Sequence, residues 1–465
     1  MIENNNENCP TGIPGFDELL QGGFPRGSTI LLIGHPGAGK TTFAAKFIYE
    51  GAKRYREKGI YFSFYESKQS FFKNMKTLGM NFEEIEKNNL FKYINILPAA
   101  DKDFAEVFTN IYMKSIKEFK PIRLVIDSIT PVLEVLTNEE ARSFFRTVLF
   151  QRIPRHNITK IIVADLPYGE ETIHLGGIEF IVDGVIIMKT RITEGLITRW
   201  MEIRKMRRRA IPMGEIPFSI SEDVGIRILA PLRPETVPAP SLEIVYSSGC
   251  KPLDEAIGGI PKGAQILLIH PPRFRAHVEL LIMSLNSILK NRLRTLFITY
   301  SLPEDIICQA IKQIARALNI NEKEIRELIL VRSINPSAHS IPEMMARIWS
   351  FIDESKPDLL ILHGLRTIFD IHGVTKEVIS YYLNNVLMLR KRGITAIYQY
   401  AAIYPNEYVA AIEYSDIVLA IVTNSKGQYV LKILKTLCRG KIGAELKLSD
   451  IEKCIEASLR DAMVM

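Results

Sequence analysis

Short apolar runs alternate with longer stretches whose apolar residues recur at helical spacing throughout the first half of the chain. The apolar runs lie at 29–33, 60–65, 123–127, 160–164 and 184–189. Runs such as 124–126 contain no alternating polar positions, which is typical of strands buried on both faces. We therefore predict a mostly parallel, doubly wound α/β sheet flanked by helices, with shorter antiparallel strands near residues 184–220.

The same pattern recurs in the second half of the chain. Residues 12–34 and 249–270 share an acidic pair, a glycine pair and the apolar run ILLI, in the same order. Two later strands also match at an offset of about 236 residues, 59–65 with 294–300 and 123–127 with 359–363. A series of matches at one offset indicates duplication of a domain rather than chance.

A proline-rich segment separates the two copies. Four prolines lie between residues 231 and 240, and such a segment continues neither a helix nor a sheet ladder. We therefore predict two tandem domains, residues 1–230 and 241–465, joined by an extended linker at 231–240. Each domain is long enough to bury its own core.

Composition adds few constraints. The 47% of hydrophobic and 24% of charged residues are typical of a globular protein, and a net charge of +7 is too small to indicate nucleic-acid binding by itself. Five scattered cysteines without a C-x-x-C pair argue against a disulfide framework and a zinc site. No apolar run approaches the length of a membrane span, so we expect a cytoplasmic protein.

A glycine-rich loop with the pattern G-x-x-x-x-G-K-T follows the first strand and precedes an amphipathic stretch. Glycines let backbone N–H groups surround a phosphate chain, and the next helix directs its N-terminus at the anion. In this pattern the lysine reaches the β- and γ-phosphates, and the hydroxyl after it faces Mg²⁺. We therefore expect the first domain to bind ATP and Mg²⁺ through Gly34, His35, Pro36, Gly37, Ala38, Gly39, Lys40, Thr41 and Thr42.

Two acidic residues end other predicted strands. Asp127 follows the run 124–126, where a carboxylate beside the phosphate loop can hold Mg²⁺ and its water shell together with Thr41. The alternative for Asp127 is a cap on the next helix. Glu66 follows the strand 60–65 and is the candidate catalytic base, with a solvated loop charge as the alternative.

Residues 204–209, with the sequence RKMRRR, form the densest basic run. Three interpretations remain open for it. The run forms a solvated surface, or it binds nucleic acid, although no aromatic or glycine-rich residues accompany it. In the third interpretation it supplies cationic fingers that reach the γ-phosphate of a neighbouring subunit.

The motifs of the first domain are those of a known family. They include TGIPGFDELLQGGFPRGS, GHPGAGKTTFAAKF, FYESKQSFFKNMKTLGM, VIDSIT and MEIRKMRRR. With these motifs, the domain resembles the KaiC-like branch of the RecA superfamily over nearly its whole length. The resemblance implies a Mg²⁺-dependent ATPase that assembles as a homo-oligomeric, commonly hexameric, ring with ATP between adjacent subunits. It also implies that Lys205 and Arg207 are the family's K-x-R finger and that Thr77 lies near the nucleotide base.

Several positions depart from the family pattern. The family usually carries two adjacent glutamates where this sequence has Tyr65-Glu66, so we expect slow hydrolysis that depends on Glu66. In the second copy the loop reads HPPRFRAH at 270–277, without the glycines, the lysine or the Mg²⁺ hydroxyl. His363 replaces Asp127 there, and Ser301 is expected to replace Glu66. We therefore predict a catalytically inactive second domain.

In the clock-type family members the second domain also carries an adjacent Ser–Thr pair for autophosphorylation. The corresponding stretch at 407–415 has only Ser415, so autokinase activity is not expected. Three functions stay open. The first is a slow ATPase whose nucleotide state regulates assembly or a protein partner. The alternatives are an accessory ATPase of DNA repair or recombination, and an ATP-gated binding module with negligible turnover.

Overall fold

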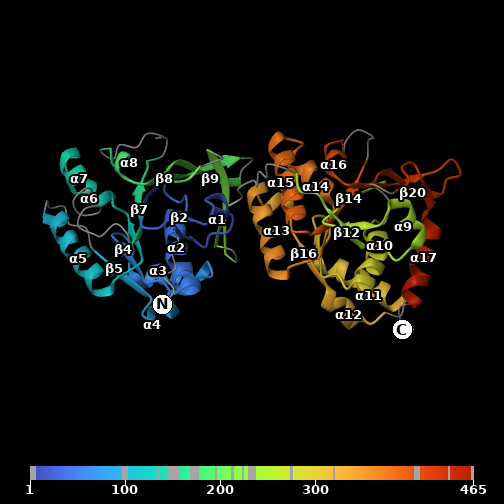
Figure 1. The fold of residues 1–465 in the computed structure, drawn as a ribbon, viewed down its shortest axis with the longest axis horizontal. Coiled ribbons are helices and arrows are strands. Elements are labelled where there is room, and N and C mark those ends of the chain that lie inside the picture. The colour runs from blue at the N-terminus through green and yellow to red at the C-terminus, as the bar shows by residue number, and fades with distance from the viewer. Residues whose placement is uncertain are drawn as a thin grey trace. The chain divides into compact units, whose positions relative to one another are not determined.

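The structure is a computed structural model that describes residues 7–96, 103–134, 136–144, 158–167, 177–193, 196–210, 214–222, 225–228, 237–272, 276–317, 320–402, 409–437 and 440–461. The chain divides into two compact units, Met1–Ala230 and Pro231–Met465 (Figure 1). The division falls at the start of the proline-rich segment, whose residues 231–236 lie outside the described part.

The first unit contains eleven described strands and eight described helices. The strands are β1 Asn8–Cys9, β2 Phe24–Pro25, β3 Thr29–Gly34, β4 Gly59–Ser63, β5 Phe91–Asn95, β6 Arg123–Asp127, β7 Thr159–Asp165, β8 Gly184–Thr193, β9 Leu196–Met206, β10 Glu215–Ser221 and β11 Gly225–Ile228. The helices are α1 Phe16–Leu19, α2 Lys40–Tyr55, α3 Lys68–Thr77, α4 Phe82–Lys87, α5 Asp103–Phe119, α6 Thr130–Glu134, α7 Asn138–Phe144 and α8 Ile178–Ile181.

Nine strands of the first unit form one sheet in the order β11-β10-β9-β8-β3-β7-β6-β4-β5. The strands from β8 to β5 are parallel to their neighbours, and β9, β10 and β11 extend the sheet with antiparallel pairing. Apolar residues of the parallel strands alternate between two cores, one against α2, α3 and α4 and the other against α5, α6 and α7 (Figure 1). The predicted doubly wound α/β fold with an antiparallel extension is confirmed.

The second unit repeats this architecture. Its strands are β12 Ser241–Tyr246, β13 Ile260–Lys262, β14 Gln265–His270, β15 Thr295–Thr299, β16 Ile329–Ser333, β17 Leu359–His363, β18 Thr395–Ala401, β19 Ile417–Thr423, β20 Tyr429–Lys435 and β21 Glu445–Lys447. Its helices are α9 Lys251–Ile257, α10 Ala276–Asn291, α11 Glu304–Ala317, α12 Glu322–Leu328, α13 Ile341–Ser355, α14 Leu365–His372, α15 Lys376–Lys391, α16 Val409–Tyr414 and α17 Leu448–Asp461. Eight strands form a sheet in the order β16-β15-β17-β18-β14-β19-β20-β21, which repeats the strand order of the first sheet from β5 to β10.

Strand register aligns the two units residue by residue and corrects one part of the sequence comparison. Gly59 lies opposite Arg123 in the first sheet, and Thr295 lies opposite Leu359 in the second. Gly59 therefore corresponds to Thr295, whereas the sequence comparison paired it with Arg294. The prediction that Ser301 replaces Glu66 was wrong by one residue.

After this correction, Leu302 stands at the position of Glu66, and Ser301 stands at that of Tyr65. No described helix is both long and apolar enough to cross a bilayer.

Candidate nucleotide-binding site

The glycine-rich loop connects β3 to α2 at the carboxyl edge of the parallel strands. Helix α2 begins at Lys40 after Gly39, whose φ is 97°. The first hydrogen bond of this helix runs from the Phe43 N–H to the Gly39 carbonyl, at 2.9 Å. The N–H groups of the first turn therefore have no acceptor within the helix and are available to an anion at the loop.

Packing against neighbouring strands explains two of the loop glycines. A Cβ on Gly34 would lie 2.3 Å from the Met188 carbonyl oxygen on β8. A Cβ on Gly39 would lie 2.3 Å from Cδ1 of Ile220 on β10, and the positive φ of Gly39 also disfavours a side chain. These glycines are therefore required for the fold of the loop as well as for the approach of a phosphate chain.

The Lys40 ammonium is held across the loop. Its Nζ donates to the carbonyl oxygens of Gly34 at 2.7 Å and His35 at 3.0 Å, and lies 3.1 Å from Oδ1 of Asp165. Only 8% of Lys40 is exposed. Asp165 ends β7 directly beside Gly34 of β3, and Ser128 donates to its other oxygen at 2.8 Å.

The sequence analysis missed Asp165, although the apolar run at 160–164 is followed by this acid in the same way that 124–126 is followed by Asp127.

Thr41 and Asp127, 86 residues apart, meet beside the loop. The Thr41 hydroxyl donates to Oδ2 of Asp127 at 2.8 Å, and the Tyr61 hydroxyl donates to the same oxygen at 2.5 Å. Burial raises the pKa of the Asp127 carboxyl, although the hydrogen bonds from Tyr61 and Thr41 oppose this shift. Burial and the Asp127 charge raise the pKa of Tyr61 well above its ordinary value, so Tyr61 stays a donor.

A hydroxyl and a carboxylate oxygen next to a phosphate-binding loop are hard ligands of the kind Mg²⁺ prefers. These side chains therefore fit a Mg²⁺–nucleotide complex. Tyr61 was not among the predicted site residues, because its place on a buried apolar strand suggested only a core role.

The side chains of Glu66 and Thr77 both form hydrogen bonds with residues of helix α3. The Glu66 carboxylate accepts hydrogen bonds from Oγ of Ser70 at 2.8 Å and Nδ2 of Asn74 at 2.7 Å. The Thr77 hydroxyl donates to the Asn74 carbonyl at 2.7 Å, within its own helix. Within the described residues, neither side chain forms a hydrogen bond or ion pair with the loop at residues 34–41. Tyr65, beside Glu66, is 67% exposed.

The two finger residues lie at the end of β9. Lys205 Nζ donates to the carbonyls of Glu179 at 3.0 Å and Phe180 at 3.2 Å, and Arg207 donates to the Phe180 carbonyl at 3.3 Å. Burial and the charge of Arg207 lower the pKa of Lys205. Arg207 keeps 53% of its side chain exposed and lies 3.5 Å from Asp183. In the described part of the chain, neither residue pairs with the loop of its own unit.

Comparison with known proteins gives a family match over the first unit. A family model described as the KaiC ATPase matches residues 9–233, which contain the loop, Asp127 and both finger residues. The first unit therefore belongs to the KaiC family of RecA-like P-loop ATPases. The circadian clock oscillator protein KaiC of Thermosynechococcus vestitus is 33% identical over 263 residues, 54% of this chain and 49% of that protein.

Other KaiC-family relatives align over more of the chain at lower identity. The circadian clock protein KaiC2 of Synechocystis sp. is 24% identical over 397 residues, covering 83% of this chain and 68% of that protein. KaiC of Prochlorococcus marinus strain MIT 9313 is 27% identical over 375 residues, covering 77% of this chain and 72% of that protein. The alignments at 33% identity span about half the length of the KaiC relatives they match.

The second unit keeps the strand order of the first but carries other side chains at the corresponding positions. His363 ends β17 at the position of Asp127, and its Nδ1 lies 3.2 Å from Oγ1 of Thr299. In the loop at 270–277, residues 273–275 lie outside the described part, as do residues 407–408 of the stretch 407–415. Ser415 of that stretch is buried, and its hydroxyl donates to the Ala411 carbonyl.

One feature of the finger persists in the second unit. Lys435 Nζ donates to the carbonyls of Ile412 at 3.2 Å and Glu413 at 2.9 Å, which repeats the contacts of Lys205. Two residues further on, Leu437 stands where the first unit has Arg207. The second unit therefore retains the lysine anchor of the finger without its arginine.

Proposed function

We infer that the first unit is a Mg²⁺-dependent ATPase of the KaiC type. The contact between Thr41 and Asp127, next to the loop that holds Lys40, carries this inference. The loop N–H groups at 37–42 and the Lys40 ammonium bind the phosphates, and Thr41 and Asp127 hold Mg²⁺ with its water shell. Bound Mg²⁺ supplies charge neutralisation to the β- and γ-phosphates.

Hydrolysis in this proposal is slow. Glu66 is the residue that orients the attacking water, and its carboxylate is already engaged by Ser70 and Asn74. Tyr65 stands where the family usually has a second glutamate, and a phenol is a poor base at neutral pH. Both donors bind Oε1, so Oε2 is the oxygen of Glu66 that orients the water in this proposal.

The active site is completed by a neighbouring copy of the chain. The exposed Arg207 and the Lys205 beside it contact the γ-phosphate of the adjacent subunit, and Thr77 lies on the nucleotide-base side of the site. This arrangement requires a closed, head-to-tail homo-oligomer, as in a hexameric ring with ATP at its interfaces. The nucleotide state regulates this assembly or a protein partner, and the second unit serves as a non-catalytic scaffold without autokinase activity.

The Lys40→Ala variant tests the site assignment. Because Lys40 carries the charge nearest the phosphates, its loss should lower Mg²⁺-dependent phosphate release at least about a hundredfold and weaken ATP binding. The matched control is Lys53→Ala, which removes an exposed lysine from the same helix and should retain the parent rate. Hydrolysis by Lys40→Ala at the parent rate would show that the loop is not the catalytic site.

An ATP-gated binding module with negligible turnover is the second candidate, favoured by the engaged Glu66 carboxylate and by Tyr65. Single-turnover measurements separate it from a slow ATPase. If bound ATP stays intact over the time in which it dissociates, the chain is a binding module. If ADP forms on the protein before release, it is an enzyme.

A further inference from the structure

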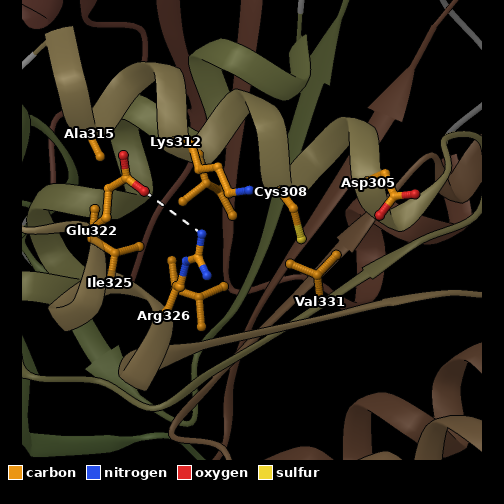
Figure 2. A pocket seen from close by; sticks show the side chains of 10 residues that line it. Asp305, Cys308, Lys312, Ala315, Glu322, Ile325, Arg326 and Val331 are labelled. Carbon is orange, nitrogen blue, oxygen red and sulfur yellow. Dashed lines mark ion pairs between the residues drawn. The ribbon is translucent and has the colours of Figure 1, made fainter.

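The second unit contains a cavity remote in sequence from the nucleotide loop. It has a volume of about 320 Å³ and opens between helices α11 and α12 and strand β16 (Figure 2). Its apolar lining consists of Ile311, Ala315, Ile325, Ile329 and Val331. Cys308, Lys312, Arg326, Glu322 and Asp305 complete the lining. This volume falls at the lower end of the range of small-molecule sites.

In the first unit, aromatic side chains fill the equivalent space. The equivalent elements are α3, α4 and β5, which carry Phe72, Phe82, Phe91 and Tyr93. The ring centroids of Phe82 and Phe91 are 4.7 Å apart, and the Phe72 ring lies 6.1 Å from each of them. This cluster is a group of aromatic rings that pack against one another.

The strand register and the first residues of the helices show which residues of the second unit stand where the first unit has these rings. Gly59 pairs with Phe91 and Thr295 pairs with Ile329, so Ile329 replaces Phe91 and Val331 replaces Tyr93. Helices α3 and α11 each begin five residues after the end of the preceding strand. The fifth residue is Phe72 in α3 and Cys308 in α11, so Cys308 replaces Phe72.

Helices α4 and α12 follow the N-cap residues Asn81 and Asn321, so Glu322 replaces Phe82. Four aromatic residues have thus become smaller or polar ones, while the backbone that surrounded them is retained.

The charges around the cavity are unequally satisfied. Glu322 lies 2.8 Å from Arg316 and 3.8 Å from Arg326, and the latter pair is marked in Figure 2. Lys312 forms no hydrogen bond or ion pair with any described residue. Figure 2 shows Lys312 above the centre of the cavity, with Asp305 at the far end. An anionic group that enters the cavity therefore meets an ammonium that no described carboxylate holds in an ion pair.

We propose that this cavity binds a small aromatic carboxylic acid. The ring of the ligand occupies the space that Phe72, Phe82 and Phe91 fill in the first unit, and it packs against Ile311, Ile329 and Val331. The carboxylate of the ligand pairs with Lys312. The site is separate from the nucleotide loop, so the proposal does not depend on ATP hydrolysis.

The probe for this site is 3-phenylpropionate, added to the full chain and followed by ligand-observed NMR and titration calorimetry. The parent protein should bind it in the range of roughly millimolar or tighter, as a compact fragment-sized ligand would. Cys308→Phe restores a first-unit ring and should weaken binding at least tenfold. Ile329→Phe restores the ring of Phe91 on β16 and should weaken binding as well. With two such variants, the test still works if one of them misfolds.

The Lys312→Met variant tests the contribution of the charge to binding separately from that of the apolar lining. It should weaken the binding of 3-phenylpropionate roughly tenfold and leave the affinity for 3-phenylpropan-1-ol unchanged, because only the acid pairs with the ammonium. The matched control is Lys76→Met, at the equivalent position of α3 beside the filled space, and it should change neither affinity.

Thermal unfolding establishes that the variants are folded. The proposal is overturned if the parent protein does not bind the acid at concentrations that saturate such a site. It is also overturned if folded Cys308→Phe and Ile329→Phe proteins both bind with the parent affinity, or if Lys312→Met weakens the acid and the alcohol equally.

Discussion

Asp127 illustrates the conflict between stability and function at a single residue. Its carboxylate is partly buried beside β4 and β7 and receives hydrogen bonds from Thr41 and Tyr61. Burial is the largest influence on its pKa and raises it. Between the ordinary and the raised pKa, the folded state binds more protons than the unfolded state, so stability falls as the pH rises through this interval. Ionised Asp127 is therefore a cost to the free protein, and a Mg²⁺ ion at the proposed site would offset this cost.

We predict that Asp127→Asn stabilises the first unit in the absence of Mg²⁺ and nucleotide. An amide oxygen still accepts from Thr41 and Tyr61, while the partly buried charge is gone. At neutral pH the gain should be roughly 1 kcal/mol, the scale of stabilising substitutions at functional sites. The gain should shrink as the pH falls and Asp127 becomes protonated. The free energy of unfolding is measured by urea titration with EDTA, in a Trp349→Phe background. Only Trp200 remains there, so its fluorescence reports the unfolding of the first unit.

The control for this prediction is Glu83→Gln, which neutralises an exposed acid on α4 and should alter stability by no more than about 0.5 kcal/mol. Asp127→Asn should also abolish Mg²⁺-dependent ATP hydrolysis. A variant that is less stable than the parent at neutral pH would show that the charge of Asp127 is compensated within the fold.

At the scale of elements, a buried ion pair joins the start of β6 to the end of α2. Arg123 is fully buried, and its Nε lies 2.6 Å from Oε2 of Glu57. Its Nη1 donates to the Phe47 carbonyl at 2.7 Å, and its guanidinium lies 4.6 Å from the centroid of the Phe47 ring. These contacts fix α2, which begins at the nucleotide loop, against the central strands.

We predict that Glu57→Ala destabilises the first unit by about 3 kcal/mol or more, because it leaves the buried Arg123 charge without its carboxylate. Calorimetric unfolding measures this loss. The matched control is Glu118→Ala, which breaks an exposed ion pair with Lys92 at 4.0 Å and should cost no more than about 1 kcal/mol. Equal effects of the two substitutions would contradict the proposed role of the buried pair.

The elements were largely predictable, and the contacts between them less so. Continuous apolar runs predicted the parallel strands, and the P-loop pattern located the turn into α2. The register of β15 was misassigned by one residue because an apolar run carries no polar marker that fixes its phase. Asp165 and Tyr61 reach the site only through strand order, which brings β7 and β4 beside residues distant in sequence.

Lys435 escaped notice for a similar reason. It lies 230 residues after Lys205, whereas the central strands are offset by about 236, because the connections between the strands differ in length. Its equivalence to Lys205 rests on the two carbonyl contacts that each lysine makes. Side-chain contacts of this kind are not encoded in local sequence patterns.

At the scale of the whole molecule, the proposed catalytic parts are split between two places in the first unit, and its described residues show no hydrogen bond or ion pair between Lys205 or Arg207 and the loop. The loop and Asp127 lie at the carboxyl edge of the parallel strands, and Arg207 follows β9 in the antiparallel extension. The second unit lacks the arginine at this position, so it cannot supply a complete finger. If Arg207 acts on a neighbouring subunit, variants on the two faces should complement each other.

We therefore predict that a mixture of Asp127→Asn and Arg207→Ala proteins recovers ATP hydrolysis that neither has alone. An interface formed by the Asp127 face of the Arg207→Ala chain and the Arg207 face of the Asp127→Asn chain has both residues intact. Random mixing of equal amounts in a head-to-tail ring gives about a quarter of such interfaces, and activity should approach that fraction of the parent rate.

The control mixture is Asp127→Asn with Lys40→Ala, and it should stay inactive because both changes fall on the loop face and no interface is intact. Mass measurements of the mixtures with Mg²⁺-ATP show whether the chains assemble together. Co-assembly without recovery in the first mixture would place Arg207 at the site of its own chain, or outside catalysis altogether. Recovery restricted to the first mixture would establish that each nucleotide site belongs to two subunits, which makes hydrolysis depend on assembly.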